Sequence, residues 1–409
     1  MRILFLADAI FEDIPGGSRV VARELARGLT ARGHAVTFLV PRQNLEAPDD
    51  EARDGVRVVR YPGAGRLLEF VREGRRACGR LWAEGPFDLV HTHFAYAAHG
   101  PLRALPCGTP HLRSFYGPWD EEGWVGDADA RRRMPGRVKA RVKRVLRRQV
   151  EAANLRRSRA VVVLSDHSRG EVRAFGYPDK DIHLIAGGTD VERFVPTEDK
   201  AAVRRGLGLP PDRALLLSIR RLAPRMGLDK LIRALPAVIA RHPDVLLLIG
   251  GQGPERERLE RLVADLGMEN HVRLLGFIPD ATLAAHYQAA DLFVLPTMAL
   301  EGFGLVTTEA LASGLPVLGT AVGATPEILS RLDPRLVVPE SSAPALASAI
   351  LDFLEGDWGR SLSPALLRGL VLDHYQWDRH VEAVERLYTQ MAGGDSAVGS
   401  AERTSLAAF

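Results

Sequence analysis

The feature that most constrains this chain is a repeated alternation of short apolar runs with longer helical stretches, which extends from residue 2 to about residue 356. The apolar runs, such as residues 160–164, are continuous and do not alternate with polar residues. Continuous apolar strands are typical of a parallel sheet with helices on both faces. The alternation therefore predicts an α/β protein built from doubly wound sheets.

The pattern can be assigned to individual elements in each half of the chain. Expected strands are 2–7, 35–40, 56–60, 88–92, 110–114, 160–164 and 182–186, then 214–219, 245–249, 272–275, 292–295, 316–319 and 335–338. Expected helices are 18–32, 66–84, 97–105, 137–157 and 167–175, then 228–241, 254–267, 280–289, 304–313, 324–331 and 343–356. Because the same theme occurs twice, it indicates two domains of one class.

The length of the chain leads to the same organisation. A chain of 409 residues is too long for one ordinary core, and domains of roughly 150–200 residues are the usual size. Residues 187–190 interrupt the strand pattern, and residues 196–199 indicate a linker. We expect an N-terminal domain over 1–190, a C-terminal domain over 191–375, a helix over 376–391 and a disordered tail over 392–409. Ligands of such folds bind beyond the carboxyl ends of the strands, so the expected site is a cleft between two facing domains.

Charge is spread unevenly along the chain. The 54 Lys and Arg residues and 51 Asp and Glu residues give a net charge of +3, yet residues 131–159 hold thirteen cations and one carboxylate. This distribution excludes a uniformly basic nucleic-acid binder. Within the basic segment, Val138, Val142, Val145 and Leu146 interleave with Lys and Arg. Such a helix either contacts an anionic lipid or acceptor, or packs an apolar underside on the N-terminal domain; the second interpretation is preferred.

Cysteine usage and hydropathy bear on the compartment. Cys78 and Cys107 are the only cysteines, which excludes a disulfide framework and a zinc site of four cysteines. Asp8 follows the first apolar residues too early for a signal peptide. No apolar run approaches the roughly 20 residues needed to cross a bilayer. We therefore expect a cytoplasmic protein, or one at the inner face of the membrane.

The most informative motif is residues 300–311, which follow an expected strand and open a helix. Gly302 and Gly304 allow a ligand to approach the backbone closely, and the unpaired amides of a helix N-terminus attract anions. Glu309 lies one helical turn beyond Leu305, where its carboxylate can accept hydrogen bonds from a vicinal diol such as ribose. The segment predicts a diphosphate site; the alternative is a glycine turn with two solvated glutamates.

A second motif, residues 218–227, follows the first strand of the C-terminal half. Arg221 and Arg225 lie four residues apart in a loop with Pro224 and Gly227, and two such cations can hold a phosphate. Arginine-rich loops are also commonly just exposed to solvent. This motif therefore supports a diphosphate site only in combination with residues 300–311.

Two weaker features lie in the N-terminal half. Gly16 and Gly17 form a loop after the first strand, with Ser18 as the expected helix N-cap. His91 and His93 end a buried strand and share one side of it. A hydrogen-bonding role for these histidines is favoured over a metal pair, since no third ligand lies nearby in the sequence.

Several familiar enzyme motifs are absent. The chain has no G-x-G-x-x-G after its first strand, no Walker A sequence, no H-E-x-x-H and no G-x-S-x-G. Nicotinamide redox chemistry, NTP hydrolysis, zinc proteolysis and α/β-hydrolase chemistry thus lose their main support. The D-x-D pairs Asp127/Asp129 and Asp179/Asp181 are interpreted as surface carboxylates, because neither closes a strand near the other motifs. No metal site is expected.

Together these motifs resemble those of the family-4 retaining glycosyltransferases, which have the GT-B fold. The residues that carry the likeness are Gly16, Gly17, His91, His93, Arg221, Gly227, Glu301, Phe303, Gly304, Glu309 and the segment 323–327. The likeness extends from residue 3 to about residue 390. It implies two Rossmann-like domains, a nucleotide-sugar donor held mostly by the C-terminal domain, an acceptor held mostly by the N-terminal domain, and a last helix that crosses back to the N-terminal domain.

The resemblance also implies roles for residues of the C-terminal domain. Glu309 would bind the ribose hydroxyls, Glu301 would contact the donor sugar and Arg221 would hold the diphosphate. Backbone amides would come from Phe303, Gly304 and Leu305. The family usually has Lys just before the glycine of the second motif, where this chain has Met226, and Arg225 is expected to take over that cation.

In the N-terminal domain, the resemblance places His93 near the transferred sugar and Gly17 near the diphosphate or the acceptor. Gly16 and Tyr116 are assigned to the acceptor. The family often has His-Gly where this chain has Tyr116 and Gly117, and a tyrosine does not readily act as a base.

The implied reaction moves a sugar from a UDP-, GDP- or ADP-sugar to an acceptor hydroxyl with retention, by a front-face route that needs neither metal nor cofactor. The acceptor is a small molecule, a glycan or a lipid-linked molecule, and no nucleic acid takes part. A nucleotide-sugar epimerase of the same fold and a non-catalytic sugar-nucleotide-binding protein stay open as alternatives. A phosphorylase is disfavoured because its lysine-bound cofactor has no matching context here.

Overall fold

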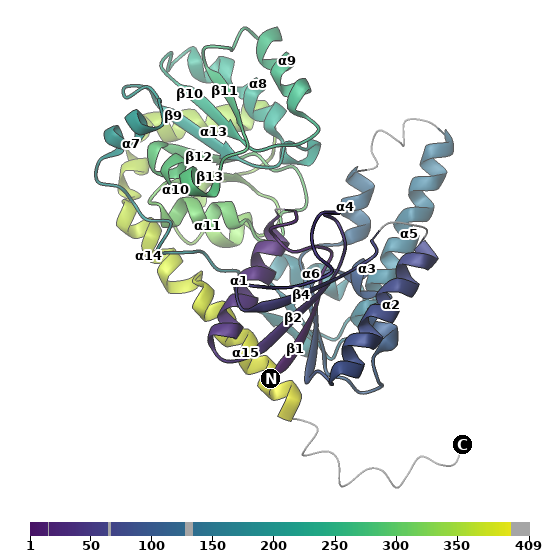
Figure 1. Ribbon diagram of the computed structural model, residues 1–409. Coiled ribbons are helices and arrows are strands. Elements are labelled where there is room, and N and C mark those ends of the chain that lie inside the picture. Colours follow the sequence, from purple (N-terminus) through teal and green to yellow (C-terminus); the bar gives the residue numbers. More distant parts are fainter. Residues whose placement is uncertain (15, 64–66, 127–133, 394–409) are drawn as a thin grey trace. The chain divides into compact units, whose positions relative to one another are not determined.

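The computed structural model describes residues 1–14, 16–63, 67–126 and 134–393 (Figure 1). The chain divides into two compact units. The first unit runs from Met1 to Ala186 and resumes at Trp377, and the second unit is Gly187–Gln376. Most of the expected tail, from residue 394 onward, lies outside the described residues.

The described residues of the first unit form an eight-stranded sheet with the order β3-β4-β2-β1-β5-β6-β7-β8. The strands are β1 Arg2–Leu6, β2 Ala35–Pro41, β3 Asp50–Arg53, β4 Val56–Tyr61, β5 Leu89–Thr92, β6 His111–Phe115, β7 Ala160–Val163 and β8 Ile182–Leu184. Neighbouring strands are parallel except for β3 and β4. Alternate residues of β1 enter different cores, with Ile3 and Phe5 in one and Leu4 and Leu6 in the other. Burial on both faces explains why the apolar runs are continuous.

Helices cover both faces of this sheet (Figure 1). They are α1 Gly17–Ala31, α2 Leu67–Glu84, α3 Ala95–Ala98, α4 Trp119–Gly126, α5 Met134–Arg157, α6 Asp166–Arg173 and α15 Trp377–Gly393, with 3-10 turns at Pro101–Ala104 and Asp179–Asp181. Helix α15 packs beside α1, because a Cβ on Gly28 would lie 2.5 Å from Cγ2 of Val381. Val384 and Tyr388 enter the same core as Phe5. The helix that begins at Trp377 is therefore part of the first unit.

The described residues of the second unit form a six-stranded parallel sheet with the order β11-β10-β9-β12-β13-β14. The strands are β9 Leu215–Ile219, β10 Leu246–Gly250, β11 Val272–Gly276, β12 Leu292–Leu295, β13 Val317–Thr320 and β14 Val337–Val338. The helices are α7 Lys200–Gly206, α8 Leu228–Ile239, α9 Arg256–Asp265, α10 Asp280–Ala289, α11 Leu305–Ala312, α12 Thr325–Leu329, α13 Ala343–Glu355 and α14 Pro364–His374, with 3-10 turns at Pro224–Met226, Pro334–Leu336 and Asp357–Ser361. The predicted α/β class with doubly wound parallel sheets is confirmed.

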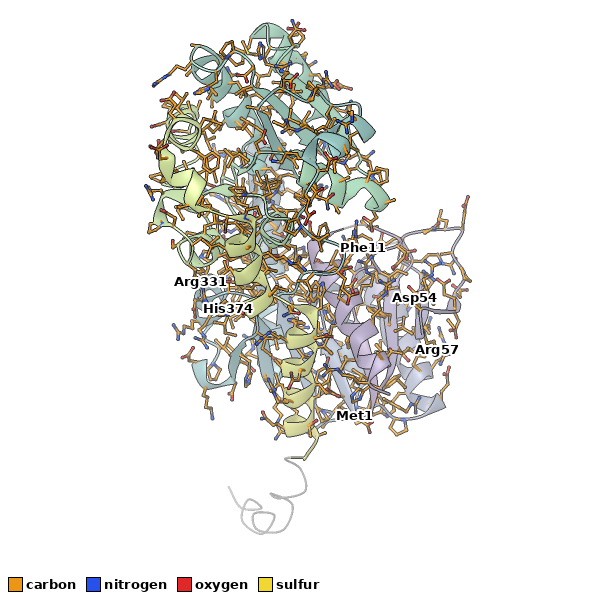
Figure 2. The ribbon with its side chains drawn as sticks, turned by 90° about the vertical axis from the view of Figure 1, so that its left-hand side faces the viewer. Met1, Phe11, Asp54, Arg57, Arg331 and His374 are labelled. Carbon is orange, nitrogen blue, oxygen red and sulfur yellow. The ribbon has the colours of Figure 1, made fainter. Side chains whose placement is uncertain are left out.

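A few elements differ from the sequence-based expectation. Strand β3 has no apolar run and is held at the sheet edge by antiparallel pairing with β4. There Nε of Arg57, labelled in Figure 2, donates to Oδ1 of Asp50 at 3.0 Å. The expected helix 97–105 is instead the short α3 and a 3-10 turn, because Pro101 cannot continue the hydrogen-bond ladder. The helices α4, α7 and α14 lie in segments for which we expected no element.

Candidate functional site

The loop between β12 and α11 places a buried glutamate at the carboxyl edge of the second sheet. Glu301 is 7% exposed, and its Oε2 accepts a hydrogen bond of 2.6 Å from Nη2 of Arg220 and one of 3.1 Å from Oγ1 of Thr297. Its carbonyl oxygen accepts a 3.0 Å bond from the amide of Ala324. Gly323 makes this contact feasible, since a Cβ there would lie 1.8 Å from that carbonyl oxygen. The Glu301 carboxylate is thus fixed in an ion pair that solvent hardly reaches.

Gly304 ends this loop and is the N-cap of α11, with φ of +88° and no side-chain cap. The first amides of a helix have no partner within the helix, and the helix dipole adds partial positive charge there. A Cβ on Gly304 would lie 3.2 Å from Oγ1 of Thr307, a buried hydroxyl that has no hydrogen-bond partner among the described residues. The turn therefore suits an anion that approaches the backbone closely.

Two of the residues expected to contact the donor are packed into the second unit. The side chain of Phe303 is 5% exposed and meets Tyr375 edge-on, with 5.7 Å between ring centroids. A Cβ on Gly187 would lie 2.8 Å from the Phe303 ring and 3.5 Å from the side chain of Leu305. Phe303 can therefore offer a ligand its backbone amide but not its ring.

Glu309 lies on α11, one turn beyond the N-terminus of the helix. Its Oε2 accepts a 2.8 Å hydrogen bond from the hydroxyl of Tyr287, which is fully buried on α10. Burial raises the pKa of Glu309, and the hydrogen bond from Tyr287 opposes this shift. The carboxylate is thus oriented by a rigid partner, as a group that recognises a diol needs to be.

The loop after β9 contains Arg221 and Arg225, the two arginines predicted to hold the diphosphate, and their surroundings differ. Arg221 is exposed. Nη1 of Arg225 donates to the carbonyl oxygens of Leu300 at 2.7 Å and Ala299 at 3.4 Å. Leu300 has a φ of +61°, which is uncommon for a residue with a side chain. Arg225 therefore holds the residue before Glu301 in a strained conformation, and part of its donor capacity goes to the protein backbone.

Arg220 is a site residue that the sequence reasoning missed. Its side chain is 7% exposed and supplies the ion pair to Glu301. The sequence contains a usable signal, because Arg220 directly follows β9 and lies two residues after Ser218. The amide of Arg220 continues the backbone pairing by bonding to the carbonyl oxygen of the last residue of β10, so strand alternation predicts that Ser218 and Arg220 share one side. The spacing of four residues favours Arg221 and Arg225 instead.

In the first unit, His91 and His93 lie on one side of the β5 end, as the alternation predicts, with 4.2 Å between ring centroids. The two nitrogens of His91 contact the hydroxyls of Tyr388 at 2.6 Å and Ser114 at 2.8 Å. His93 contacts the Tyr116 hydroxyl through Nδ1 at 2.8 Å, and its buried Nε2 has no partner among the described residues. Burial lowers the pKa of His93 to about 3, so its ring is neutral at physiological pH. These neutral rings fit the hydrogen-bonding role predicted from the sequence.

The glycine loop of the first unit starts a helix without a side-chain cap. Helix α1 begins at Gly17 and its N-cap is Gly16, so the expectation that Ser18 is the N-cap is wrong. The amides of Arg19 and Val20 both donate to the carbonyl oxygen of Gly16. This local bonding explains why the serine hydroxyl is not needed at the cap position.

A small pocket of about 30 Å³ lies beside α1 in the first unit. Its lining includes Phe11 and Asp54, both labelled in Figure 2, and the side chains of Arg23 and Arg27. Arg27 pairs with Asp54 at 2.6 Å, and Arg23 pairs with Glu24 at 2.8 Å. Because these cations already have carboxylate partners, the pocket offers no strong anion site.

The expected site residues thus fall into two groups. In the second unit, Glu301 and Gly304 lie together with the unexpected Arg220 and Thr307, and Glu309 follows on the same helix as Gly304. In the first unit, His93 and Tyr116 form the second group. Gly16 and Gly17 belong to neither, since they open α1.

The sequence matches two families that together cover most of the chain. Residues 15–193 match the family described as Glycosyltransferase Family 4, and residues 199–363 match Glycosyl transferases group 1. The GDP-mannose-dependent alpha-(1-6)-phosphatidylinositol monomannoside mannosyltransferase of Mycolicibacterium smegmatis is 33% identical over 362 residues, which cover 86% of this chain and 89% of that protein. The chain is a family-4 glycosyltransferase.

Further relatives of this glycosyltransferase support its fold and class. The phosphatidyl-myo-inositol mannosyltransferase of the same organism is 29% identical, with 96% of this chain and 95% of that protein covered. The sucrose-phosphate synthase of Thermosynechococcus elongatus has a TM-score of 0.81 and 26% identity, with 96% of this chain and all of that chain covered. Anabaena HepE in complex with UDP, at 20% identity and a TM-score of 0.70, shows the same GT-B fold. The resemblance to family-4 enzymes with the GT-B fold is confirmed, and the protein is an enzyme of hexosyl transfer in carbohydrate biosynthesis.

Proposed function

We propose that this enzyme transfers a hexose from a nucleoside-diphosphate sugar to an acceptor hydroxyl, with retention at the anomeric carbon and without a metal ion. The observation that supports this proposal is the Arg220–Glu301 pair beside the N-terminal turn of α11. A buried cation and the N-terminal amides of a helix thus occur in the same site. Such a combination stabilises a diphosphate both when bound and when it leaves. Because two mannosyltransferases are among its relatives, the donor we propose is GDP-mannose.

In the proposed reaction, the bond between the anomeric carbon and the phosphate oxygen breaks as the acceptor oxygen bonds to that carbon on the same face. The proton of the acceptor hydroxyl passes to the departing phosphate oxygen. The developing charge on the diphosphate is stabilised by the arginine cations and by the amides of residues 303–305. Glu309 holds the nucleoside through its ribose, and Glu301 contacts the sugar. No cofactor is required in this scheme.

A transfer assay tests this function directly. The purified chain is incubated with GDP-mannose, UDP-glucose or ADP-glucose, with and without vesicles of phosphatidylinositol, and in the presence of EDTA. We expect transfer from GDP-mannose that EDTA does not change and that yields the α-anomer, as read by mass spectrometry and NMR. An epimerised donor without acceptor would support an epimerase, and nucleotide binding without any turnover would support a binding protein. Activity abolished by EDTA and restored by Mg²⁺ would overturn metal independence alone.

We also propose that the acceptor is lipid-borne and that α5 contacts an anionic membrane. The preferred interpretation from the sequence, an apolar underside packed on the N-terminal domain, is wrong. Val138, Val142, Val145 and Leu146 are each at least half exposed, at 59%, 53%, 55% and 50%. The opposite side of the helix is buried, as at Ala140. No helix among the described residues is both long and apolar enough to span a bilayer.

The spacing of the exposed residues explains why this surface suits a membrane. At 100° per residue they fall on one stripe of α5, and lysines and arginines flank it. An apolar stripe with cations on both sides is typical of helices that lie in the interface of anionic bilayers. A second copy of the same face would bring cations against cations, so self-association is disfavoured. The two mannosyltransferase relatives have phosphatidylinositol compounds in their names, which agrees with a lipid-borne acceptor.

Vesicle flotation provides the test of membrane contact. We expect binding to phosphatidylcholine vesicles only when they contain phosphatidylglycerol, and loss of binding between about 0.1 M and 1 M salt, where the Debye length falls from about 10 to 3 Å. Replacing Val138, Val142 and Leu146 by Ser should weaken binding about tenfold or more, since each change removes an apolar contact with the bilayer. Leu45→Ser with Leu68→Ser is the matched control, because both leucines are 82% exposed and lie outside α5. Equal binding by both variants would contradict the assignment.

A further inference from the structure

The guanidinium of Arg220 is only partly satisfied by the protein. Its side chain is 7% exposed, and Nη2 donates to Oε2 of Glu301 at 2.6 Å. Nη1 is buried and has no hydrogen-bond partner among the described residues. A buried donor without an acceptor is costly, and the cost is greater when the donor belongs to a charged group. A ligand that supplies an acceptor would remove this cost.

The same location contains a second unsatisfied polar group. A Cβ on Gly304 would lie 3.6 Å from Oε1 of Glu301 and 3.2 Å from Oγ1 of Thr307. That threonine hydroxyl is also buried without a partner. The carboxylate that pairs with Arg220 and the unpaired hydroxyl of Thr307 therefore both lie beside Gly304, where the amides of α11 favour an anion.

Met226 shows why the chain needs a cation from another position. Family-4 glycosyltransferases usually have Lys here, and this chain has a buried methionine whose Sδ lies 3.1 Å from Nη2 of Arg220. Thioether sulfur is a weak acceptor and carries no charge. A lysine at residue 226 would bring its ammonium group to the region that the Arg220 guanidinium already occupies. The positive charge is thus present in this loop, but it comes from a different residue.

The other arginines of the loop are less suited to replace the missing lysine. Nη1 of Arg225 donates to the carbonyl oxygens of Ala299 and Leu300. Arg221 is exposed, where solvent screens its charge. Arg220, by contrast, is buried, and its Nη1 has no hydrogen-bond acceptor among the described residues. It is therefore the arginine best suited to bind an anion here.

We propose that Arg220 supplies the cation that the loop lacks at Met226, with Nη1 donating to the diphosphate of the donor. This inference rests on the proposed function, since it assumes a nucleoside-diphosphate ligand. It assigns to Arg220 the contact that the sequence assigned to Arg225. Glu301 then has a second role, because it orients the guanidinium so that one amino group faces the protein and the other faces the ligand.

The test is a charge exchange between the two positions, with affinity for GDP and for guanosine measured by calorimetry. Arg220→Lys keeps a cation for Glu301 but loses the forked geometry, and it should weaken GDP binding about tenfold without changing guanosine binding. Arg220→Met should weaken GDP binding about 30-fold or more. Adding Met226→Lys to Arg220→Met should recover most of this loss, whereas Met226→Lys alone should weaken binding through repulsion between like charges.

Arg261→Met is the matched control, because this exposed arginine lies on α9 outside the loop. If Arg220→Met does not fold, Arg220→Lys and the double variant still carry the test. Wild-type affinity for GDP in Arg220→Lys, or no recovery in the double variant, would overturn the inference. If the wild-type enzyme binds no nucleoside diphosphate, the proposed function itself fails, which separates the two outcomes.

Discussion

Replacing Glu309 by Gln is expected to lower turnover about 100-fold while leaving the free enzyme at least as stable at neutral pH. The amide keeps the shape of the side chain and can still accept the hydrogen bond that Tyr287 donates to Glu309. It loses the negative charge that strengthens hydrogen bonds from two ribose hydroxyls, and charged hydrogen bonds contribute roughly 1.5–3 kcal/mol each. The loss should appear in the KM for the donor as well as in kcat, because the ribose is bound before and during the reaction.

The stability part of this prediction follows from the raised pKa of Glu309. Burial makes the charged form less favourable in the folded enzyme than in the unfolded chain. The carboxyl group therefore contributes stability at acidic pH, and this contribution is lost as the pH rises through its folded pKa. The melting temperature of Glu309→Gln should equal or exceed that of the wild type at neutral pH, and the two should approach each other as the pH falls.

The matched control is Glu257→Gln, an exposed glutamate on α9. This variant should keep full turnover and the wild-type dependence of stability on pH. Wild-type turnover in Glu309→Gln would remove this residue from the donor site. Reduced turnover together with a lower melting temperature at neutral pH would indicate a structural role instead.

Much of the fold could be predicted because burial on both faces leaves a clear pattern in the sequence. Residues 3–6 of β1 are all apolar, since both sides of this strand pack against a core. Strand β3 carries no such signal, because Asp50 and its neighbours lie at the sheet edge and are held by pairing with β4. Only two residues, Asp54 and Gly55, separate β3 from its partner β4, and both have positive φ. This Asp-Gly hairpin turn is the local signal from which β3 could have been predicted.

The candidate site could be predicted as a set of segments but not as a set of contacts. The glycines and glutamates of residues 300–311 are recognisable because a turn and a helix start need them. Which arginine turns inward depends on how the loop after β9 meets the loop after β12. A Cβ on Gly227 would lie 1.9 Å from the carbonyl oxygen of Pro296, and Arg225 bonds to the carbonyl oxygen of Leu300. Such contacts between segments about 70 residues apart have no counterpart in sequence spacing.

For the basic helix α5, the sequence predicts the element but not what its apolar stripe contacts. Its periodicity predicts an amphipathic helix, and α5 is one. An apolar stripe is compatible with a protein core and with a membrane, because both exclude water. Only the exposure of Val142 and its neighbours distinguishes the two. Periodicity therefore identifies a surface that needs a partner without identifying the partner.

Acidification below pH 6.5 is expected to destabilise the first unit steeply. The buried histidines among the described residues, His91, His93, His111 and His380, all lie in this unit. Burial lowers the pKa of His93 and His111 to about 3 and that of His380 to about 4, and it lowers the pKa of His91 as well. An unfolded histidine binds a proton near pH 6.5, so the unfolded chain takes up protons that the folded unit excludes. The stability is fully present above pH 6.5 and is lost as the pH falls toward the folded values.

The expected slope follows from the number of protons taken up on unfolding. Each such histidine should lower the free energy of unfolding by about 1.4 kcal/mol per pH unit once the pH is below 6.5. Urea unfolding monitored by circular dichroism between pH 7.5 and 5 measures this slope, in acetate and phosphate buffers of equal ionic strength. His380→Gln removes one titrating ring and retains an amide donor for the carbonyl oxygen of Ala186, so it should reduce the slope by the contribution of one histidine.

His374→Gln is the control for this experiment, because His374 is exposed on α14 of the second unit and should leave the slope unchanged. A wild-type slope in His380→Gln would show that its ring is already protonated in the folded enzyme.

The neutral state of His93 has a further consequence for catalysis. Because burial keeps His93 uncharged in the folded unit, protonation of His93 should not lower activity before the first unit begins to unfold. An activity loss at a higher pH, in a fully folded enzyme, would instead indicate a titrating group in the donor site, for which Glu309 is the candidate.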